Sequence, residues 1–389
     1  MYNIKTLNKI SPKGLDRFDK KRYLCSDNVE DADAVLVRSA SMHDLELPAS
    51  LKAIARAGAG TNNIPIDACS KKGIVVFNTP GANANAVKEL VLAGLFLASR
   101  KVVNGIEWAK TLKGNGAEVG KMVEKGKGAF AGPEIAGKTL GVIGLGAIGI
   151  LVANAAEKLG MKVYGHDPYL SVDGAWTLSQ SVIHAQNLSD IYANCDYISI
   201  HVPLNNETRD MICDEAIASM KDGVRILNFA RGELVNSEAI IKALESGKVA
   251  SYVTDFPNDD VIGVDGVIAI PHLGASSPES EENCAVMAAD QIINFLETGS
   301  IKNSVNLPAT ELGVPTANRI CIIHKNVPNV IAKISACVSK ENINIDKLIN
   351  NSKKEYAYTV LDTDTNSVPD TVVNAIRDID EVIRVWVVK

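Results

Sequence analysis

The sequence predicts an α/β protein built around a doubly wound parallel sheet, and three observations support this. Six short apolar runs alternate with helix-length segments between residues 139 and 270. A glycine-rich turn follows the first of these runs. The last third of the chain adds a segment of about 70 residues with its own order of strands and helices. Strands that alternate with helices are typical of a parallel sheet covered on both faces.

Composition narrows the class of protein. The 389 residues carry a formal net charge of −6 without a basic block, so nucleic acid is not an expected partner. The longest apolar stretch, 91–98, is far shorter than the ~20 residues that span a bilayer, and the first residues lack a secretory signal pattern. Seven scattered cysteines form no CxxC pair, so we expect no metal site and no disulfide framework. A reducing cytoplasm is the expected compartment.

The first third of the chain alternates strand and helix patterns. Buried strands are predicted at 34–39, 53–57 and 73–78, because each is an apolar run ended by a polar residue or glycine. One long helix is predicted from Ala84 to about Trp108. The next segment, 113–132, is rich in Gly and Lys and predicts an exposed linker.

The middle of the chain predicts a Rossmann sheet. Its strands are expected at 140–143, 162–166, 196–200, 224–228, 250–254 and 267–270. Their number and spacing match two mononucleotide-binding halves. A long helix from about Glu279 to Glu297 follows and is closed by Gly299.

The turn after the first of these strands predicts a dinucleotide site. It is a GxGxxG, formed by Gly144, Leu145, Gly146, Ala147, Ile148 and Gly149, and it opens an apolar helix. Asp167 stands at the end of the next strand, 23 residues after Gly144, where it can accept hydrogen bonds from a ribose diol. No arginine follows Asp167, so NAD is favoured over NADP. A tight structural turn with a capping Asp is the alternative.

Polar residues follow several predicted strands, where ligands bind in such sheets. They are His201-Val202-Pro203, Phe229-Ala230-Arg231, Asp255 with Asp259 and Asp260, and His272 with Gly274. An arginine fork can hold a carboxylate, and a histidine can take the proton of a hydroxyl as hydride leaves. The set therefore predicts hydride transfer from a 2-hydroxy acid. Packing for His201, a surface ion pair for Arg231 and a solvated loop for Asp259 are the alternatives.

Together these stretches resemble the D-isomer-specific 2-hydroxyacid dehydrogenases. The resemblance rests on GKTLGVIGLGAIG (137–149), LNFARGELV (227–235), PHLGASS (271–277), NTPGANANAVKELV (78–91) and RAGAGTNNI (56–64). It is most specific for members that oxidise 3-phospho-D-glycerate to 3-phosphohydroxypyruvate with NAD, the first step towards L-serine. It implies that Arg231 binds the carboxylate and that His272 is the acid/base. It also implies substrate contacts from residues near Arg38, Ser39, Asn62 and Asn83.

One departure concerns the acid that partners the histidine. The family has a glutamate there, whereas this chain has Asn258-Asp259-Asp260. Asp259 is the better match and Asp260 the second choice.

The resemblance also implies the domain plan. A Rossmann domain (93–274) is inserted in a flavodoxin-like substrate domain (1–92 and 275–303), and the catalytic cleft lies between them. A linker (304–316) leads to the last domain (317–389), whose predicted βαββαβ order is ferredoxin-like.

That last domain resembles the ACT regulatory domains, which pair between subunits and bind small amino acids. His324, Asn326 and Asn344 match positions that hold serine in regulated relatives. Asn329 replaces the usual glycine, so both a serine effector and a purely dimerising tail are expected alternatives. A homodimer or homotetramer is expected. Another small D-2-hydroxy acid as substrate, or an NAD-sensing binding protein, are the competing functions.

Overall fold

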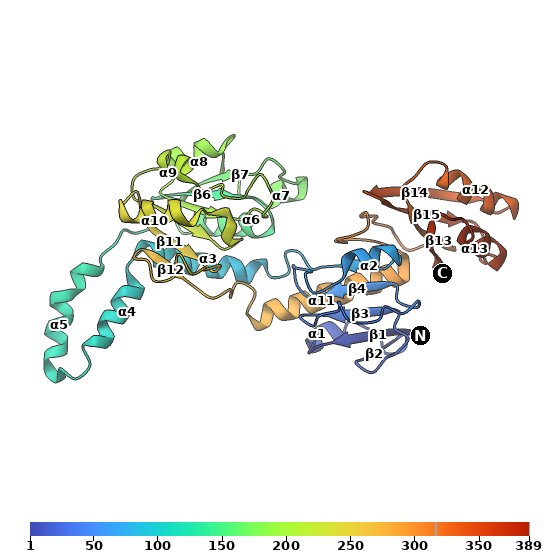
Figure 1. The fold of residues 1–389 in the computed structure, drawn as a ribbon, viewed down its shortest axis with the longest axis horizontal. Coiled ribbons are helices and arrows are strands. Elements are labelled where there is room, and N and C mark those ends of the chain that lie inside the picture. The colour runs from blue at the N-terminus through green and yellow to red at the C-terminus, as the bar shows by residue number, and fades with distance from the viewer. Residues whose placement is uncertain (316, 389) are drawn as a thin grey trace. The chain divides into compact units, whose positions relative to one another are not determined.

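The computed structural model describes residues 1–315 and 317–388. It divides into two compact units (Figure 1). Unit 1 comprises Met1–Asn83 and Pro278–Lys389, and unit 2 comprises Ala84–Ser277. Among the described helices, none combines the length and apolar character needed to cross a bilayer.

Unit 1 contains a five-stranded parallel sheet in the order β2-β1-β3-β4-β5. Its strands are β1 (Tyr2–Leu7), β2 (Tyr23–Ser26), β3 (Ala34–Val37), β4 (Ala53–Arg56) and β5 (Val75–Phe77). The three predicted strands of this region are present as β3, β4 and β5, each one to three residues shorter than predicted. The prediction missed β1 and β2, since β1 mixes polar and apolar residues and only Ile4 of it is fully buried.

Three helices accompany this sheet: α1 (Pro12–Leu15), α2 (Ile66–Lys71) and α11 (Pro278–Thr298). The long helix α11 agrees with the prediction, and it packs on the sheet through a stripe that includes Ala288, Ile292 and Phe295. It ends at Gly299, whose φ of 74° is left-handed, as the predicted glycine stop requires.

Unit 2 is built on a seven-stranded parallel sheet in the order β12-β11-β10-β9-β6-β7-β8. The strands are β6 (Thr139–Ile143), β7 (Lys162–His166), β8 (Ile183–His184), β9 (Tyr197–Ile200), β10 (Val224–Asn228), β11 (Val249–Thr254) and β12 (Val267–Ala269). The chain reverses direction across the sheet between β6 and β9, which is the switch point where such sheets bind ligands. All six predicted strands are confirmed, and the two-residue β8 was missed.

The helices of unit 2 connect these strands. They are α3 (Ala84–Ser99), α6 (Ala147–Lys158), α7 (Val172–Thr177), α8 (Leu188–Asn194), α9 (Asp214–Ala218), η3 (Gly232–Leu234) and α10 (Ser237–Glu245). Helix α3 packs on α6 and on β10 and β11. Gly94 permits this approach, because a Cβ there would lie 2.8 Å from the Phe229 ring.

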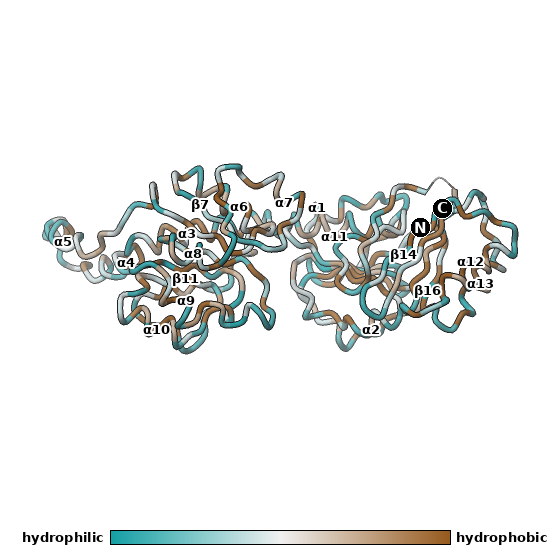
Figure 2. The backbone as a smooth tube through the Cα atoms, turned by 90° about the horizontal axis from the view of Figure 1, so that it is seen from above, coloured by the Kyte–Doolittle hydropathy of each residue, from teal (hydrophilic) through white to brown (hydrophobic). Residues whose placement is uncertain are grey.

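The predictions of one helix from Ala84 to about Trp108 and of an exposed linker at 113–132 are wrong. The helix breaks after Ser99, and a helical hairpin follows: α4 (Val102–Thr111), η1 (Gly116–Glu118), α5 (Val119–Gly126) and η2 (Lys127–Phe130). The hairpin extends from the rest of unit 2 in both views, with mostly hydrophilic colouring around α5 (Figures 1 and 2). Trp108 packs on Phe130 with the ring planes tilted and the centroids 5.2 Å apart, and a Cβ at Gly126 would lie 2.3 Å from Trp108. Glycine at position 126 therefore allows the Trp108 ring to pack closely against α5.

The C-terminal segment forms an antiparallel sheet in the order β14-β15-β13-β16. Its elements are β13 (Arg319–Lys325), α12 (Val330–Lys340), β14 (Ile345–Lys353), β15 (Tyr356–Thr363), α13 (Asp370–Arg377) and β16 (Val382–Val388). The predicted βαββαβ order is confirmed. One face of the sheet packs on α12 and α13, and the other shares the core of unit 1 with α11, where Cys321 and Tyr358 join Phe295.

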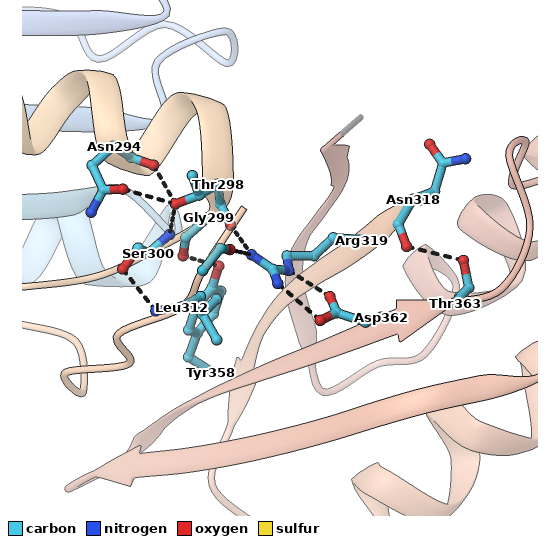
Figure 3. A network of polar contacts seen from close by, with 11 residues as sticks. Asn294, Thr298, Gly299, Ser300, Leu312, Asn318, Arg319, Tyr358, Asp362 and Thr363 are labelled. Atoms are coloured by element: carbon cyan, nitrogen blue, oxygen red, sulfur yellow. Dashed lines mark hydrogen bonds and ion pairs between the residues drawn. The ribbon is translucent and has the colours of Figure 1, made fainter. Parts of the chain in front are cut away.

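A buried arginine ties this C-terminal sheet to the end of α11 (Figure 3). The Nη1 group of Arg319 donates to the carbonyl oxygens of Thr298 and Gly313, at 2.6 and 2.7 Å. Its Nε and Nη2 groups donate to the carboxylate of Asp362, at 2.5 and 2.9 Å. The Tyr358 hydroxyl donates to the Gly299 carbonyl at 2.7 Å. A cation here also complements the negative end of the helix dipole.

The segment before the sheet is likewise held in unit 1. The Asn306 side chain accepts from the Val76 N–H and donates to the Ile74 carbonyl, both at 2.9 Å. Asn306 is buried, so this segment adds polar contacts along β5.

We expect Arg319→Met to lower the free energy of unfolding by about 3 kcal/mol, because Asp362 and two buried carbonyls lose their donor. Chemical denaturation followed by circular dichroism measures this. Lys242→Met is the control, since Lys242 pairs with Glu238 at the surface and its loss should leave the midpoint unchanged. Equal effects of the two variants would contradict a docking role for Arg319.

Candidate active site

The glycine turn joins β6 to α6 through close backbone contacts. Gly144 has a φ of 91°, and a Cβ there would lie 2.6 Å from the His201 carbonyl oxygen. A Cβ at Gly149 would lie 1.9 Å from the Gly144 carbonyl oxygen. By contrast, a Cβ at Gly146 would meet nothing within 4 Å. The two outer glycines are therefore needed by the fold, and the middle one leaves open space at the N-terminus of α6, where a diphosphate fits.

Asp167, at the end of β7, is fixed beside this turn. Its Oδ2 accepts from the Leu145 N–H and its Oδ1 from the Tyr169 N–H, both at 2.8 Å. Each carboxylate oxygen keeps a free lone pair after these bonds. The side chain can therefore accept hydrogen bonds from a ribose diol, as the fingerprint predicts.

His201, with Val202 and Pro203, follows β9 on the other side of the turn. Its N–H donates to the Ile143 carbonyl at 2.7 Å, and its Nε2 lies 2.8 Å from the Ser199 hydroxyl. The buried Nδ1 has no hydrogen-bond partner in the described part of the chain. Burial lowers the pKa of His201 to about 4, so the ring is neutral at physiological pH. These contacts fit packing beside the cofactor loop.

The loop after β10 is shaped by Asn228, which is fully buried. Its Nδ2 donates to the Arg231 carbonyl at 2.8 Å, and its Oδ1 accepts from the Ala230 N–H at 3.2 Å. This turn leaves the Arg231 side chain exposed, with one internal bond from Nη1 to the Ala230 carbonyl at 2.6 Å. Sequence reasoning gave Asn228 no role, although a buried polar residue at a strand end is a signal for one.

The aromatic ring of Phe256 lies close to both predicted reactive residues. It contacts the exposed His272 ring at a centroid distance of 4.4 Å, and the Arg231 Cζ lies 5.5 Å from its centroid. The structure thus brings the loops after β10, β11 and β12 together. Sequence reasoning missed Phe256, because a phenylalanine in a loop carries no chemistry of its own.

Asp255 is the buried carboxyl of this cluster. It is 2% exposed, and its Oδ1 has no hydrogen-bond partner among residues 1–315 and 317–388. Burial raises the pKa of Asp255 to about 6, while the charges of His272 and Arg231 and a backbone bond from Gly274 oppose that rise. The Asp255 carboxyl group therefore lies within electrostatic reach of both the His272 and the Arg231 side chains.

Asp259 and Asp260 lie in the exposed loop that follows. The Asn258 Nδ2 group donates to the Ser237 hydroxyl at 3.0 Å and lies 3.5 Å from the Asp260 carboxylate. Across the described chain, no hydrogen bond or ion pair joins His272 to either aspartate. The structure does not bring the predicted acid and the histidine together.

The predicted substrate residues belong to unit 1. Arg38 and Ser39 follow β3, and Asn62 lies in the loop after β4, so these three stand beyond the carboxyl ends of the parallel strands. Arg38 pairs with Glu281 at 2.5 Å, the Ser39 N–H donates to Asn8, and the Asn62 carbonyl bonds to His43. Asn83 is half-buried in the turn before α3. A cavity of about 710 Å³ lies beside α11, and none of these four residues is among those that line it.

The three candidate effector residues have separate partners. His324 is buried in β13, with Nδ1 at 2.8 Å from the Lys325 carbonyl and Nε2 at 2.8 Å from the Thr359 hydroxyl. Asn326 donates to the Lys354 carbonyl at 3.1 Å, and Asn344 donates to Asp346 at 3.0 Å. In the described chain no bond links the three.

Comparison with known proteins gives a consistent result. The model of the D-isomer specific 2-hydroxyacid dehydrogenase, NAD binding domain, matches residues 93–274. The D-3-phosphoglycerate dehydrogenase of Haemophilus influenzae is 32% identical over 339 residues, which cover 84% of this chain and 78% of that protein. The Bacillus subtilis enzyme of the same name is 33% identical, covering 79% of this chain and 60% of that protein.

A solved structure agrees. The NAD+-bound 3-phosphoglycerate dehydrogenase of Entamoeba histolytica aligns with a TM-score of 0.58 at 26% identity, covering 78% of this chain and 98% of that chain. This chain spans between 52% and 60% of the length of the relatives from Bacillus subtilis, Archaeoglobus fulgidus and Methanocaldococcus jannaschii.

The fold and the glycine turn define an NAD-binding protein of the Rossmann class, with an arginine and a histidine grouped at the carboxyl edge of its sheet. The chain belongs to the family of D-isomer-specific 2-hydroxyacid dehydrogenases.

The glycine turn generates a paired prediction. Gly146→Ala should keep the stability of the fold, because the added methyl group would meet no protein atom within 4 Å. It should weaken NAD binding at least tenfold, because the methyl group would occupy space that the diphosphate needs. Gly149→Ala should destabilise the fold, because its Cβ would overlap the Gly144 carbonyl. Thermal unfolding and NAD titration calorimetry measure the two effects, and unaltered NAD affinity in Gly146→Ala would contradict the assignment.

Asp255 generates a pH-dependent prediction. Its raised pKa means that ionisation is costlier in the folded chain than in the unfolded chain, where the value is near 3.8. The penalty is absent below that value and complete above about 6. Asp255→Asn should therefore raise the free energy of unfolding by about 3 kcal/mol near neutral pH and leave it unchanged in acid. Urea titrations at both pH values test this, and equal gains at both would refute it.

Proposed function

We propose that the protein oxidises 3-phospho-D-glycerate to 3-phosphohydroxypyruvate with NAD, the first step towards L-serine. The observation that carries this proposal is the contact of both Arg231 and His272 with one aromatic ring, in the unit that holds the glycine turn. The names of the Haemophilus influenzae and Entamoeba histolytica relatives support the choice of substrate.

The proposed chemistry divides between two exposed side chains. The Arg231 guanidinium binds the substrate carboxylate through two parallel hydrogen bonds and so fixes carbon 2. His272 accepts the proton of the carbon 2 hydroxyl as the hydride leaves that carbon. NAD, when bound, supplies the hydride acceptor.

The remaining residue roles are proposals of the same kind. Gly144, Gly146, Ala147, Ile148, Gly149 and Asp167 hold the dinucleotide, together with residues 201–203, Phe229, Ala230, Asp255 and Gly274. Arg38, Ser39, Asn62 and Asn83 contact the substrate. Asp259, with Asp260 as second choice, is the family acid that would support His272, and the charge of Asp255 makes it a rival for that role.

For the domains we propose an NAD-binding domain at 93–274, a substrate domain at 1–92 and 275–303, a linker at 304–316 and an ACT-like domain at 317–389. The strand order of the C-terminal sheet supports the last assignment, since it is that of ferredoxin-like folds. Asn329 has a left-handed φ of 69°, a conformation that asparagine tolerates better than most residues. The usual glycine at this position can thus be replaced without a change of backbone.

A homo-oligomer and an L-serine effector complete the proposal. Val102, Val103 and Ile106 on α4 are 44%, 38% and 52% exposed, and such an apolar surface favours burial against a second copy. Seven free cysteines support a reducing compartment such as the cytoplasm.

The test is NAD reduction with a panel of D-2-hydroxy acids, with and without a phosphate group. We expect 3-phospho-D-glycerate to give the highest kcat/KM, and Arg231→Met to reduce it by about 10²–10³-fold, because the carboxylate loses a bidentate partner. A preference for glycerate or lactate would instead assign another hydroxy acid, and NAD binding without turnover would assign a sensor. Adding L-serine to the same assay tests the effector.

A further inference from the structure

Phe256 shares its ring with two groups that the proposed reaction uses. The Arg231 Cζ lies 5.5 Å from the ring centroid, and the His272 ring lies at 4.4 Å with an angle of 44° between the planes. Arg231 is always a cation, and His272 becomes one when it accepts a proton. A ring that contacts both groups can therefore set the position of each.

The backbone around Phe256 is fixed independently of its ring. The Phe256 N–H donates to the hydroxyl of the fully buried Thr254, at 3.1 Å, at the end of β11. On the other side, a Cβ at Gly232 would lie 3.3 Å from the Phe256 carbonyl oxygen, so the loop after β10 rests on this backbone. The ring therefore has a defined place from which it can set the positions of its neighbours.

We propose that Phe256 is a positioning residue, whose ring holds the Arg231 guanidinium and the His272 imidazole at a fixed spacing. This inference rests on the proposed function and adds a specificity element to it. The negative face of an aromatic ring attracts cations. A rigid ring also costs less to order than a flexible aliphatic side chain, so the guanidinium is held before the carboxylate arrives.

Asp255 lies next to Phe256 in the chain, and its carboxyl group interacts electrostatically with both His272 and Arg231. Replacing the ring alone leaves the charges of Asp255 and Arg231 in place, so the test isolates the contribution of the ring.

The test compares Phe256→Leu, which keeps an apolar side chain, with Phe256→Tyr, which keeps the ring. Calorimetry with NAD-saturated protein measures the affinity for oxalate, a small dicarboxylate probe. We expect Phe256→Leu to weaken oxalate binding about fivefold and Phe256→Tyr to stay within about twofold of the parent. Kinetics should show a raised KM and a lower kcat for Phe256→Leu, and Phe256→Tyr should restore both.

Two controls separate the outcomes. Phe18→Leu removes a buried ring that packs on Tyr23 in unit 1, and it should leave oxalate affinity unchanged. Circular dichroism and NAD affinity show that each variant is folded. Unchanged oxalate affinity in Phe256→Leu, or equal losses in Phe256→Leu and Phe256→Tyr, would overturn the inference. If no hydroxy acid is turned over but oxalate binding still requires the ring, the proposed function fails and the inference stands.

Discussion

The contact of backbone with backbone at the glycine turn is the constraint on which the rest of unit 2 depends. The Cα of Gly149 lies against the Gly144 carbonyl, and Gly144 lies against the His201 backbone, so β6, α6 and β9 meet with no side chain between them. This contact fixes the switch point of the sheet. Since neighbouring strands are paired in parallel from there outward, it also sets where the loops after β10, β11 and β12 end, and hence where Arg231, Phe256 and His272 meet.

Elements buried on both faces were predictable because most of their residues are apolar. Strands β3, β9 and β10 are of this kind. Strands β1 and β8 were not, since they mix polar and apolar residues and only Ile4 among their residues is fully buried. The hairpin at 102–130 failed for another reason. Its glycines and lysines suggest a linker by composition alone, whereas in three dimensions they accommodate Trp108 and pair with glutamates one helical turn away.

The site residues likewise divide into those whose positions the sequence predicts and those whose positions it does not. The positions of Arg231 and His272 follow from strand order, because both come directly after strands of one parallel sheet. The carboxylate that partners His272 is harder to predict. The course of the loop 255–262 decides which aspartate approaches the histidine, and no sequence periodicity describes that course. Asp255 owes its electrostatic weight to burial next to Gly274, and Phe256 owes its place to a hydrogen bond with Thr254. Both depend on distances that a sequence does not contain.

The apolar face that the C-terminal sheet shares with α11 has a consequence for how the chain can be shortened. Trp386 stacks on Tyr358 and lies edge-on to Phe295 of α11, so aromatic rings from both parts form one cluster. A chain truncated before β13 would expose Phe295 and Leu296 to water, and this apolar surface would promote aggregation. The C-terminal sheet therefore supplies part of the core of unit 1, and experiments on either part need both in one chain.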